Sequence, residues 1–214
     1  MTLFQLILLG VSAFFAYKVY EHVMSLNDET IQKKQEPQSN NDEDVSSNSS
    51  QKDGYRALIP TLDSLIEKAD EAYMSENLKL AKDYLYEAQR YYDRNQEVLF
   101  KLGYICSQQE AYDEAIDFLK SALDIEHDAA THNLLGSIYR AKKEYDSAAE
   151  SYEAAIRVDE LNSVTYFNYA NLLLDMKDEQ KAALMYQKAI DIDPDFKEAH
   201  QELEKLKEEQ KDEA

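Results

Sequence analysis

The 214-residue sequence has few of the residues that break helices or build cysteine-based sites. It contains four glycines, three prolines, one cysteine and no tryptophan. So few turn-forming residues argue against a sheet of many strands, and the single cysteine, Cys106, excludes an internal disulfide and a cysteine-based zinc site. Positive charge is also scarce, because 43 acidic residues outnumber 23 lysines and arginines, which gives a formal net charge of -20. We expect such a chain to repel phosphate backbones and therefore predict no binding to nucleic acid.

The sequence also offers no arrangement of residues that is typical of catalysis. Its four histidines are scattered without the spacing of metal ligands, and no glycine-rich phosphate loop or nucleophile motif is present. His132 and Cys106 fall at positions that favour packing inside a helical core, so we expect both to be structural and the thiol to be unreactive. We predict a protein that is not an enzyme and that binds no cofactor, no metal and no small-molecule substrate.

The first 23 residues are mostly apolar. No charged side chain precedes Lys18, and Leu3–Tyr20 reads LFQLILLGVSAFFAYKVY. As a helix this stretch would span about 27 Å, close to the thickness of a bilayer's hydrocarbon core. A cleaved signal peptide is a weaker alternative, since no basic residue precedes the apolar run and no good cleavage site follows it. A buried core helix is the other alternative, but a polar segment follows at once. We predict a transmembrane anchor at residues 1–23.

A polar region follows the predicted anchor. Residues 24–55 are rich in asparagine, serine, glutamine and acidic residues and almost lack large apolar side chains. Such a segment cannot bury enough surface to offset its ordering entropy, so we predict a disordered linker, with a short lead-in at residues 56–61. Lysines on the C-terminal side of the anchor favour a cytoplasmic over a periplasmic location for the rest of the chain. We predict a single-pass protein of a bacterial inner membrane, with the mitochondrial outer surface as the alternative.

From residue 62 onward, small and apolar residues recur every 33 or 34 positions. The recurring sets are Ala69, Gly103, Gly136 and Ala170; Ala81, Ala115, Ala148 and Ala182; Leu85, Leu119, Tyr152 and Tyr186; and Ala88, Ala122, Ala155 and Ala189. Within each copy, the spacing of i, i+3, i+4 and i+7 places the apolar residues on one stripe of a helix. The small residues would let the two helices of a hairpin approach closely. Each hairpin would leave an apolar face that the next hairpin covers.

This pattern resembles the tetratricopeptide repeat (TPR) family, in which W-x2-L-G-x2-Y, A-x3-F-x2-A and P recur at a period of 34 residues. The clearest copies are Leu99-x-x-Leu102-Gly103-x-x-Cys106 and His132-x-x-Leu135-Gly136-x-x-Tyr139. The tryptophan position holds other residues in all four copies, and the first copy lacks the Leu-Gly pair. The resemblance implies an all-α, right-handed solenoid of four hairpins, at residues 62–95, 96–128, 129–162 and 163–196. Residues 197–214 are predicted to form a capping helix and an acidic tail. An ordinary helical bundle with accidental spacing is the alternative.

The resemblance also implies where a partner binds, because the first helix of each hairpin lines a concave groove in TPR arrays. Carried over by register, the groove residues are Tyr73, Phe100, Tyr104, Asn133, Ser137, Arg140, Phe167 and Asn171. Aromatic rings, amides and one arginine could hold an extended peptide or a helix. Some TPR proteins hold a partner's C-terminal carboxylate at positions that are Ile66 and Asp70 here. These two residues cannot hold a carboxylate, so we expect no binding of chaperone tails in that manner.

These features together predict a membrane-tethered scaffold or adaptor that binds a protein partner. The predicted anchor suggests a role in the assembly of the cell envelope or of a membrane complex. The alternative is a non-catalytic accessory subunit of a larger secretion, pilus or enzyme complex. The sequence does not indicate which partner is bound.

Overall fold

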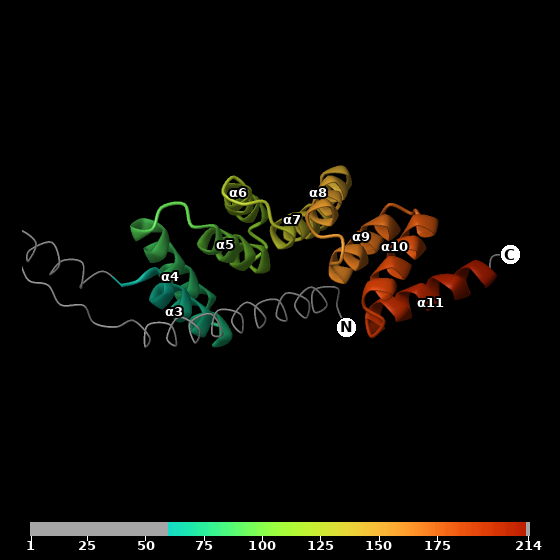
Figure 1. Ribbon diagram of the computed structural model, residues 1–214, viewed down its shortest axis with the longest axis horizontal. Helices are drawn as coiled ribbons and strands as arrows, with labels where there is room; N and C mark the ends of the chain where they lie inside the picture. Colours follow the sequence, from blue (N-terminus) through green and yellow to red (C-terminus); the bar gives the residue numbers. More distant parts are fainter. Residues whose placement is uncertain (1–59, 213–214) are drawn as a thin grey trace, which may run out of the picture. The chain divides into compact units, whose positions relative to one another are not determined.

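The computed structural model describes residues 60–212, which are helical apart from short connections (Figure 1). The chain divides into two units, Met1–Lys52 and Asp53–Ala214, and every described residue belongs to the second unit. The predicted transmembrane anchor at 1–23 and the predicted linker at 24–55 lie outside the described residues. Among the described helices, none combines the length and the apolar character that crossing a membrane requires.

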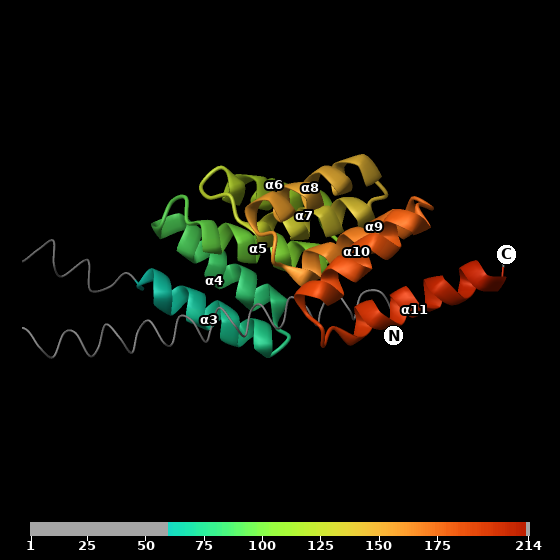
Figure 2. The same cartoon turned by 45° about the vertical axis from the view of Figure 1, so that its right-hand side comes forward.

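Nine helices make up the described part of the chain. They are α3 (Leu62–Met74), α4 (Leu78–Tyr91), α5 (Gln96–Gln108), α6 (Tyr112–Leu123), α7 (Ala129–Ala141), α8 (Tyr145–Val158), α9 (Ser163–Asp175), α10 (Glu179–Ile192) and α11 (Lys197–Asp212). Short turns join α3 to α4, α5 to α6, α7 to α8 and α9 to α10, and each pair packs together as a hairpin; we number these hairpins 1 to 4. The second helix of each hairpin also contacts the first helix of the next, so the hairpins follow one another in a row (Figure 2). The predicted all-α array of helical hairpins is thereby confirmed.

The turns inside the four hairpins share one backbone geometry. The middle turn residues, Glu76, Glu110, Lys143 and Lys177, have φ values of 59°, 59°, 63° and 65°. The residue after each of them donates its backbone N–H to the helix carbonyl five positions back, which satisfies a group at the helix end. A left-handed φ is unfavourable for a residue with a side chain. The packing of the hairpins therefore imposes these turns at some cost to the local backbone.

Small residues lie where the two helices of a hairpin come closest. A Cβ added at Gly136 would lie 2.7 Å from the ring of Tyr152, and one added at Gly103 would lie 2.6 Å from Cγ of Leu119. In hairpins 1 and 4 the same position holds Ala69 and Ala170, which are buried. The predicted role of these residues in close helix approach is confirmed.

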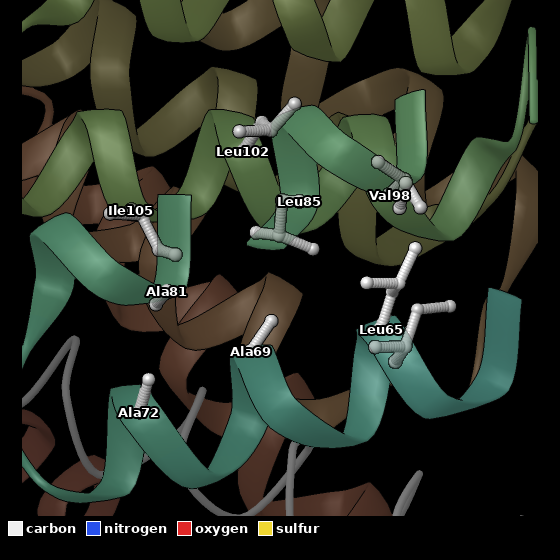
Figure 3. Packing of buried hydrophobic residues seen from close by; sticks show 10 residues of the cluster. Leu65, Ala69, Ala72, Ala81, Leu85, Val98, Leu102 and Ile105 are labelled. Carbon is white, nitrogen blue, oxygen red and sulfur yellow. The ribbon is translucent and has the colours of Figure 1, made fainter. Parts of the chain in front are cut away.

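The core continues from each hairpin into the next. In Figure 3, Leu65 and Ala69 of α3 face Leu85 of α4, while Val98 and Leu102 of α5 lie on the other side of Leu85. All five side chains are buried in one cluster. The first helix of hairpin 2 thus covers the apolar face that hairpin 1 leaves open, as expected for a stacked repeat.

Helix α11 packs on hairpin 4 as a single helix. Its Ala199, Leu203 and Leu206 are buried in the cluster that contains Tyr186. Glu204 lies 34 residues after Ala170, at the position where the earlier first helices have a small residue, and it is exposed. A charged side chain there gives α11 a polar outer face, which is what the last element of a repeat array requires.

Candidate functional site

The candidate site consists of first-helix side chains that meet from one hairpin to the next. We call it the first-helix face and define it by residues of α3, α5, α7 and α9. They are Asp70, Tyr73, Phe100, Lys101, Tyr104, Gln108, Asn133, Ser137, Arg140, Phe167, Asn168, Asn171 and Asp175. Hydrogen bonds and ion pairs across this face join residues 31 to 35 positions apart, which is about one repeat.

In hairpins 1 and 2 the face contains a cluster of two tyrosines and one amide. The Tyr73 hydroxyl donates to the Tyr104 hydroxyl at 3.2 Å, and Nε2 of Gln108 donates to each hydroxyl at 2.7 Å. The two rings are tilted, with centroids 5.8 Å apart. Burial and the bond with Tyr73 raise the pKa of Tyr104, so its hydroxyl stays protonated. The cluster ties α3 to α5 through polar contacts.

Beside this cluster lies a buried ion pair. Nζ of Lys101 is 2.7 Å from Oδ1 of Asp70, and the two side chains are only 6% and 14% exposed. Glu97 adds a longer contact to the same ammonium group at 3.5 Å. A buried ammonium group is stable only with such partners. The Lys101–Asp70 pair is therefore a contact within the protein itself. Because the carboxylate of Asp70 would repel a partner's carboxylate, this end of the face is unsuited to binding one.

In hairpins 3 and 4 the face carries amides and a second ion pair. Nδ2 of Asn168 donates to Oδ1 of Asn133 at 3.2 Å, which links α9 to α7. Nε of Arg140 donates to Oδ2 of Asp175 at 2.6 Å, again from α7 to α9. The Arg140 side chain is 11% exposed and that of Asp175 is 38% exposed. These contacts fix the spacing of α7 and α9 while part of each amide stays accessible.

Tyrosines of the second helices position two further residues of the face. The hydroxyls of Tyr152 and Ser137 are 3.1 Å apart, and the Tyr186 hydroxyl donates to Oδ1 of Asn171 at 2.6 Å. Burial raises the pKa of Tyr152 to about 12 and also raises that of Tyr186, so both hydroxyls remain protonated. Hairpins 1 and 2 have leucine at the equivalent position and lack these bonds.

The eight residues predicted from the sequence fall into two groups. Tyr73, Asn133, Ser137, Arg140 and Asn171 are partly exposed. Phe100, Tyr104 and Phe167 are 7%, 2% and 6% exposed, so little of their side-chain surface is available to a partner.

The burial of Phe167 has a clear cause in the packing. Its ring centroid lies 5.5 Å from that of Tyr186 and 5.0 Å from that of Phe196, so the ring belongs to the core of hairpin 4.

Three residues of the first-helix face, Lys101, Gln108 and Asn168, were not predicted from the sequence. A signal for Lys101 does exist, because it is the only charged residue in the otherwise apolar stretch 98–106.

Cys106 and His132 both make contacts with other side chains of the repeats. Cys106 is a buried free thiol, 3.3 Å from Nζ of Lys82, and burial raises its pKa. A protonated, buried thiol is a poor nucleophile. Burial lowers the pKa of His132, whose Nε2 is 3.4 Å from Nδ1 of His127. Within residues 60–208, no three histidine, cysteine or acidic side chains come together as metal ligands.

A row of stacked helical hairpins, held together by small residues at a fixed period, defines a helical repeat protein. Two protein-family sequence models, both described as "Tetratricopeptide repeat", match the chain. One matches residues 66–130 and the other residues 127–195, and together they cover more than half of its length. The chain therefore belongs to the tetratricopeptide repeat family, whose members act as protein–protein interaction scaffolds.

Individual similar proteins share the repeats at low sequence identity. BBSome complex member BBS4 of Bos taurus is 25% identical over 120 residues, which cover 50% of this chain and only 23% of BBS4. Among solved structures, MamA is 23% identical with a TM-score of 0.61, over 66% of this chain and 84% of MamA. YrrB, described as "a TPR protein with an unusual peptide-binding site", is 22% identical with a TM-score of 0.58, over 72% of this chain and 84% of YrrB. At such identities the solved structures support the fold alone.

Proposed function

We propose that this protein is a membrane-tethered adaptor that holds a partner peptide or helix on its first-helix face. The observation that carries the proposal is the pair of contacts Asn133–Asn168 and Arg140–Asp175. They align polar groups of successive first helices into one face, and those groups remain partly exposed. A face built from several repeats offers a partner many small contacts, which is how repeat proteins bind extended surfaces.

The proposed tether is residues 1–23, and its support comes from the sequence. This stretch is mostly apolar, carries no charged side chain before Lys18 and is long enough to span a bilayer, and a polar linker would let the repeats reach a partner at some distance. We further propose that the protein lies in a bacterial inner membrane with its repeats in the cytoplasm, and that it serves envelope or membrane-complex assembly without catalysing a reaction.

Affinity purification with a matched pair of variants tests the binding face. The variant with Asn133→Ala and Arg140→Ala changes two partly exposed residues of the first-helix face. The control with Gln187→Ala and Arg157→Ala changes the same residue classes on second helices, where both side chains are exposed. We expect crosslinked partners to be recovered with the control and lost with the first variant. Equal recovery from both would show that this face is not the binding surface.

Membrane extraction tests the tether. We expect the full chain to remain in the membrane fraction after alkaline carbonate treatment, and a chain lacking residues 1–23 to be released. Release of the full chain would refute the tether. Protease added to intact spheroplasts should leave the repeats uncut, and their digestion would place them on the outer side.

The second candidate function is that of a non-catalytic subunit of a larger complex. The observation that favours it is the partial similarity to BBS4, a protein named as a BBSome complex member. Purification from native membranes would then give one stoichiometric complex. An adaptor would instead give partners in variable amounts.

A further inference from the structure

The two edges of the repeat array differ in how their charges are used. Because the helices of a hairpin run antiparallel, the turns inside the hairpins lie at one edge and the connections between hairpins lie at the other. We call the first of these the turn edge. The second is the connection edge, and we define it by residues 124–128, 158–162 and 192–195.

At the turn edge, lysines neutralise acidic residues at the starts of the second helices. Nζ of Lys142 lies 2.6 Å from Oδ1 of Asp113 and 3.0 Å from Oε1 of Glu144. Nζ of Lys181 lies 2.7 Å from Oδ2 of Asp178. These carboxylates therefore have cationic partners within the protein.

The connection edge carries carboxylates that have no such partners. None of its exposed acidic residues forms an ion pair with another residue in the described part of the chain. They are Asp124, Glu126, Asp159, Glu160, Asp193 and Asp195. Asp124 is also the C-cap of α6, where the negative end of the helix dipole disfavours a carboxylate. Arg157 and Lys197 stand just outside the edge in sequence and are outnumbered, so the edge keeps an excess of negative charge.

Exposed apolar side chains stand among these carboxylates. Ile125, Val158 and Leu161 are 38%, 47% and 70% exposed. Ile125 and Val158 occupy the same position of successive repeats, and Ile192, one repeat later, is partly exposed. Apolar side chains on successive connections thus form a row along this edge.

Leu161 is the most exposed large apolar residue of the described chain, and its turn does not require a leucine. Oδ1 of Asp159 accepts from the backbone N–H of Leu161 at 3.0 Å. In the next connection, Oδ1 of Asp193 accepts in the same way from the backbone N–H of Asp195 at 3.1 Å. Since an aspartate serves equally well at this position, the side chain of Leu161 is available for contact with another molecule.

We propose that the connection edge binds a helix of a second protein, whose apolar stripe is bordered by lysine or arginine. The row of apolar residues covers the stripe, and the carboxylates neutralise the flanking cations. A helix suits this edge because it bonds its own backbone groups. It therefore needs from its partner only apolar contact and negative charge, which are what the edge supplies.

The spacing of the connections also fits a helix. The first helices α7 and α9 contact each other, and packed helices lie about 8–10 Å apart. Residues seven positions apart on a helix are separated by roughly 10 Å along its axis. Apolar residues at that interval in the partner would therefore meet successive connections.

This inference goes beyond the proposed function, because the connection edge shares no residue with the first-helix face. A protein with both surfaces can hold two partners at once, which is what an adaptor that brings proteins together requires. Partners that are lost when Asn133 and Arg140 are changed belong to the first-helix face. Partners of the connection edge depend on a different set of residues.

Selection from two helix libraries on the full chain, kept in detergent micelles, tests the inference. Both libraries carry variable apolar residues along one stripe. Lysine and arginine border the stripe in the basic library, and glutamate and aspartate border it in the acidic library. Clearing both against empty micelles removes helices that bind detergent. We expect binders from the basic library alone, and the best binder, labelled with a dye, gives affinities by fluorescence anisotropy at a fixed detergent concentration.

Variants of the exposed apolar residues locate the contact. Val158→Ser with Leu161→Ser should weaken the selected helix about tenfold, because each apolar side chain that the helix covers contributes in proportion to the area buried. The matched control is Met176→Ser with Leu184→Ser, which changes two exposed apolar residues away from the connection edge. The control should leave the affinity unchanged.

Variants of the carboxylates test the role of charge. Asp124→Asn, Glu126→Gln and Glu160→Gln together should weaken the helix about tenfold at low salt and reduce the effect of added salt, because exposed ion pairs are individually weak and are screened by salt. The control neutralises three exposed carboxylates near the turn edge, at Glu76, Glu110 and Glu179, and should leave binding unchanged. Far-ultraviolet circular dichroism checks that every variant is folded.

Four results would overturn the inference. Binders obtained equally from the acidic library would show that the charge of the edge does not select its partner. Equal affinities of the edge variants and their controls would show that the helix binds elsewhere. Loss of binding only in the variant with Asn133→Ala and Arg140→Ala would place the helix on the first-helix face and leave the proposed function standing. The absence of binders from both libraries would refute the edge as a helix site, and the affinity purification above tests the first-helix face independently.

Discussion

Replacing Gly136 with alanine should destabilise the protein, although alanine is the better helix former. The new Cβ would lie 2.7 Å from the ring of Tyr152, while carbon atoms in favourable contact are about 3.5–4.0 Å apart. The ring cannot move aside easily, because it is fully buried and its hydroxyl lies 3.1 Å from that of Ser137. Overpacking of this kind lowers the free energy of unfolding by about 1–3 kcal/mol, and the helix preference of alanine offsets about 1 kcal/mol of that loss. We therefore expect a net loss of about 1 kcal/mol, the middle of the resulting range of about 0–2 kcal/mol.

Urea unfolding of the whole chain, followed by circular dichroism, measures this difference. The matched control is Ala170→Gly, which makes the reverse change in hairpin 4, where Ala170 packs in a cluster with Tyr186. It should also destabilise, by about 1 kcal/mol, since it removes a buried methyl group and lowers helix preference. A gain in stability for Gly136→Ala would mean that helix preference outweighs the close approach, and would refute the packing argument.

Three further predictions concern buried hydroxyls, a turn and alkaline pH. Thr165→Val should stabilise by about 1 kcal/mol, because the buried Thr165 hydroxyl has no hydrogen-bond partner among residues 60–212, whereas Thr131→Val should destabilise by a similar amount, because it loses a bond to Asp128. Denaturant unfolding of the two variants checks the opposite signs. Lys143→Gly should stabilise by about 1 kcal/mol, measured in the same way, since glycine adopts the observed φ of 63° without strain. Burial raises the pKa of Tyr152 and of Tyr169 from about 10 to about 12. Because the folded state favours the protonated phenols, their contribution to stability is complete below pH 10 and is lost as the pH rises towards 12. A titration that follows helix content and tyrosinate absorbance together should show both changes in that range.

The repeat could be predicted from the sequence because its packing has a narrow size requirement. Only glycine or alanine fits where the helices of a hairpin meet, so Gly103, Gly136 and their equivalents recur at a fixed interval and reveal the register. The first helices of the predicted repeats then follow from that register, and α5 and α7 begin at residues 96 and 129.

The details of the first-helix face could not be predicted in the same way. Register indicates which side of a helix a residue lies on, but not which neighbours its side chain reaches. Phe167 shows this, because the ring turns into the core and contacts Tyr186 and Phe196. Asn168 was missed because its bond to Asn133 spans 35 residues, one position out of register. Such contacts depend on the rotation of one helix against the next, which a periodic pattern does not encode.

Site-specific photo-crosslinking in living cells tests the central claim most directly. A photoreactive amino acid placed at Asn168 on α9 lies on the first-helix face, and one placed at Gln187 on α10 is exposed on the second helix of the same hairpin. The account predicts a protein crosslink from position 168 and none, or a much weaker one, from position 187. A partner captured only from position 187 would show that this repeat array binds through its second helices and would contradict the account.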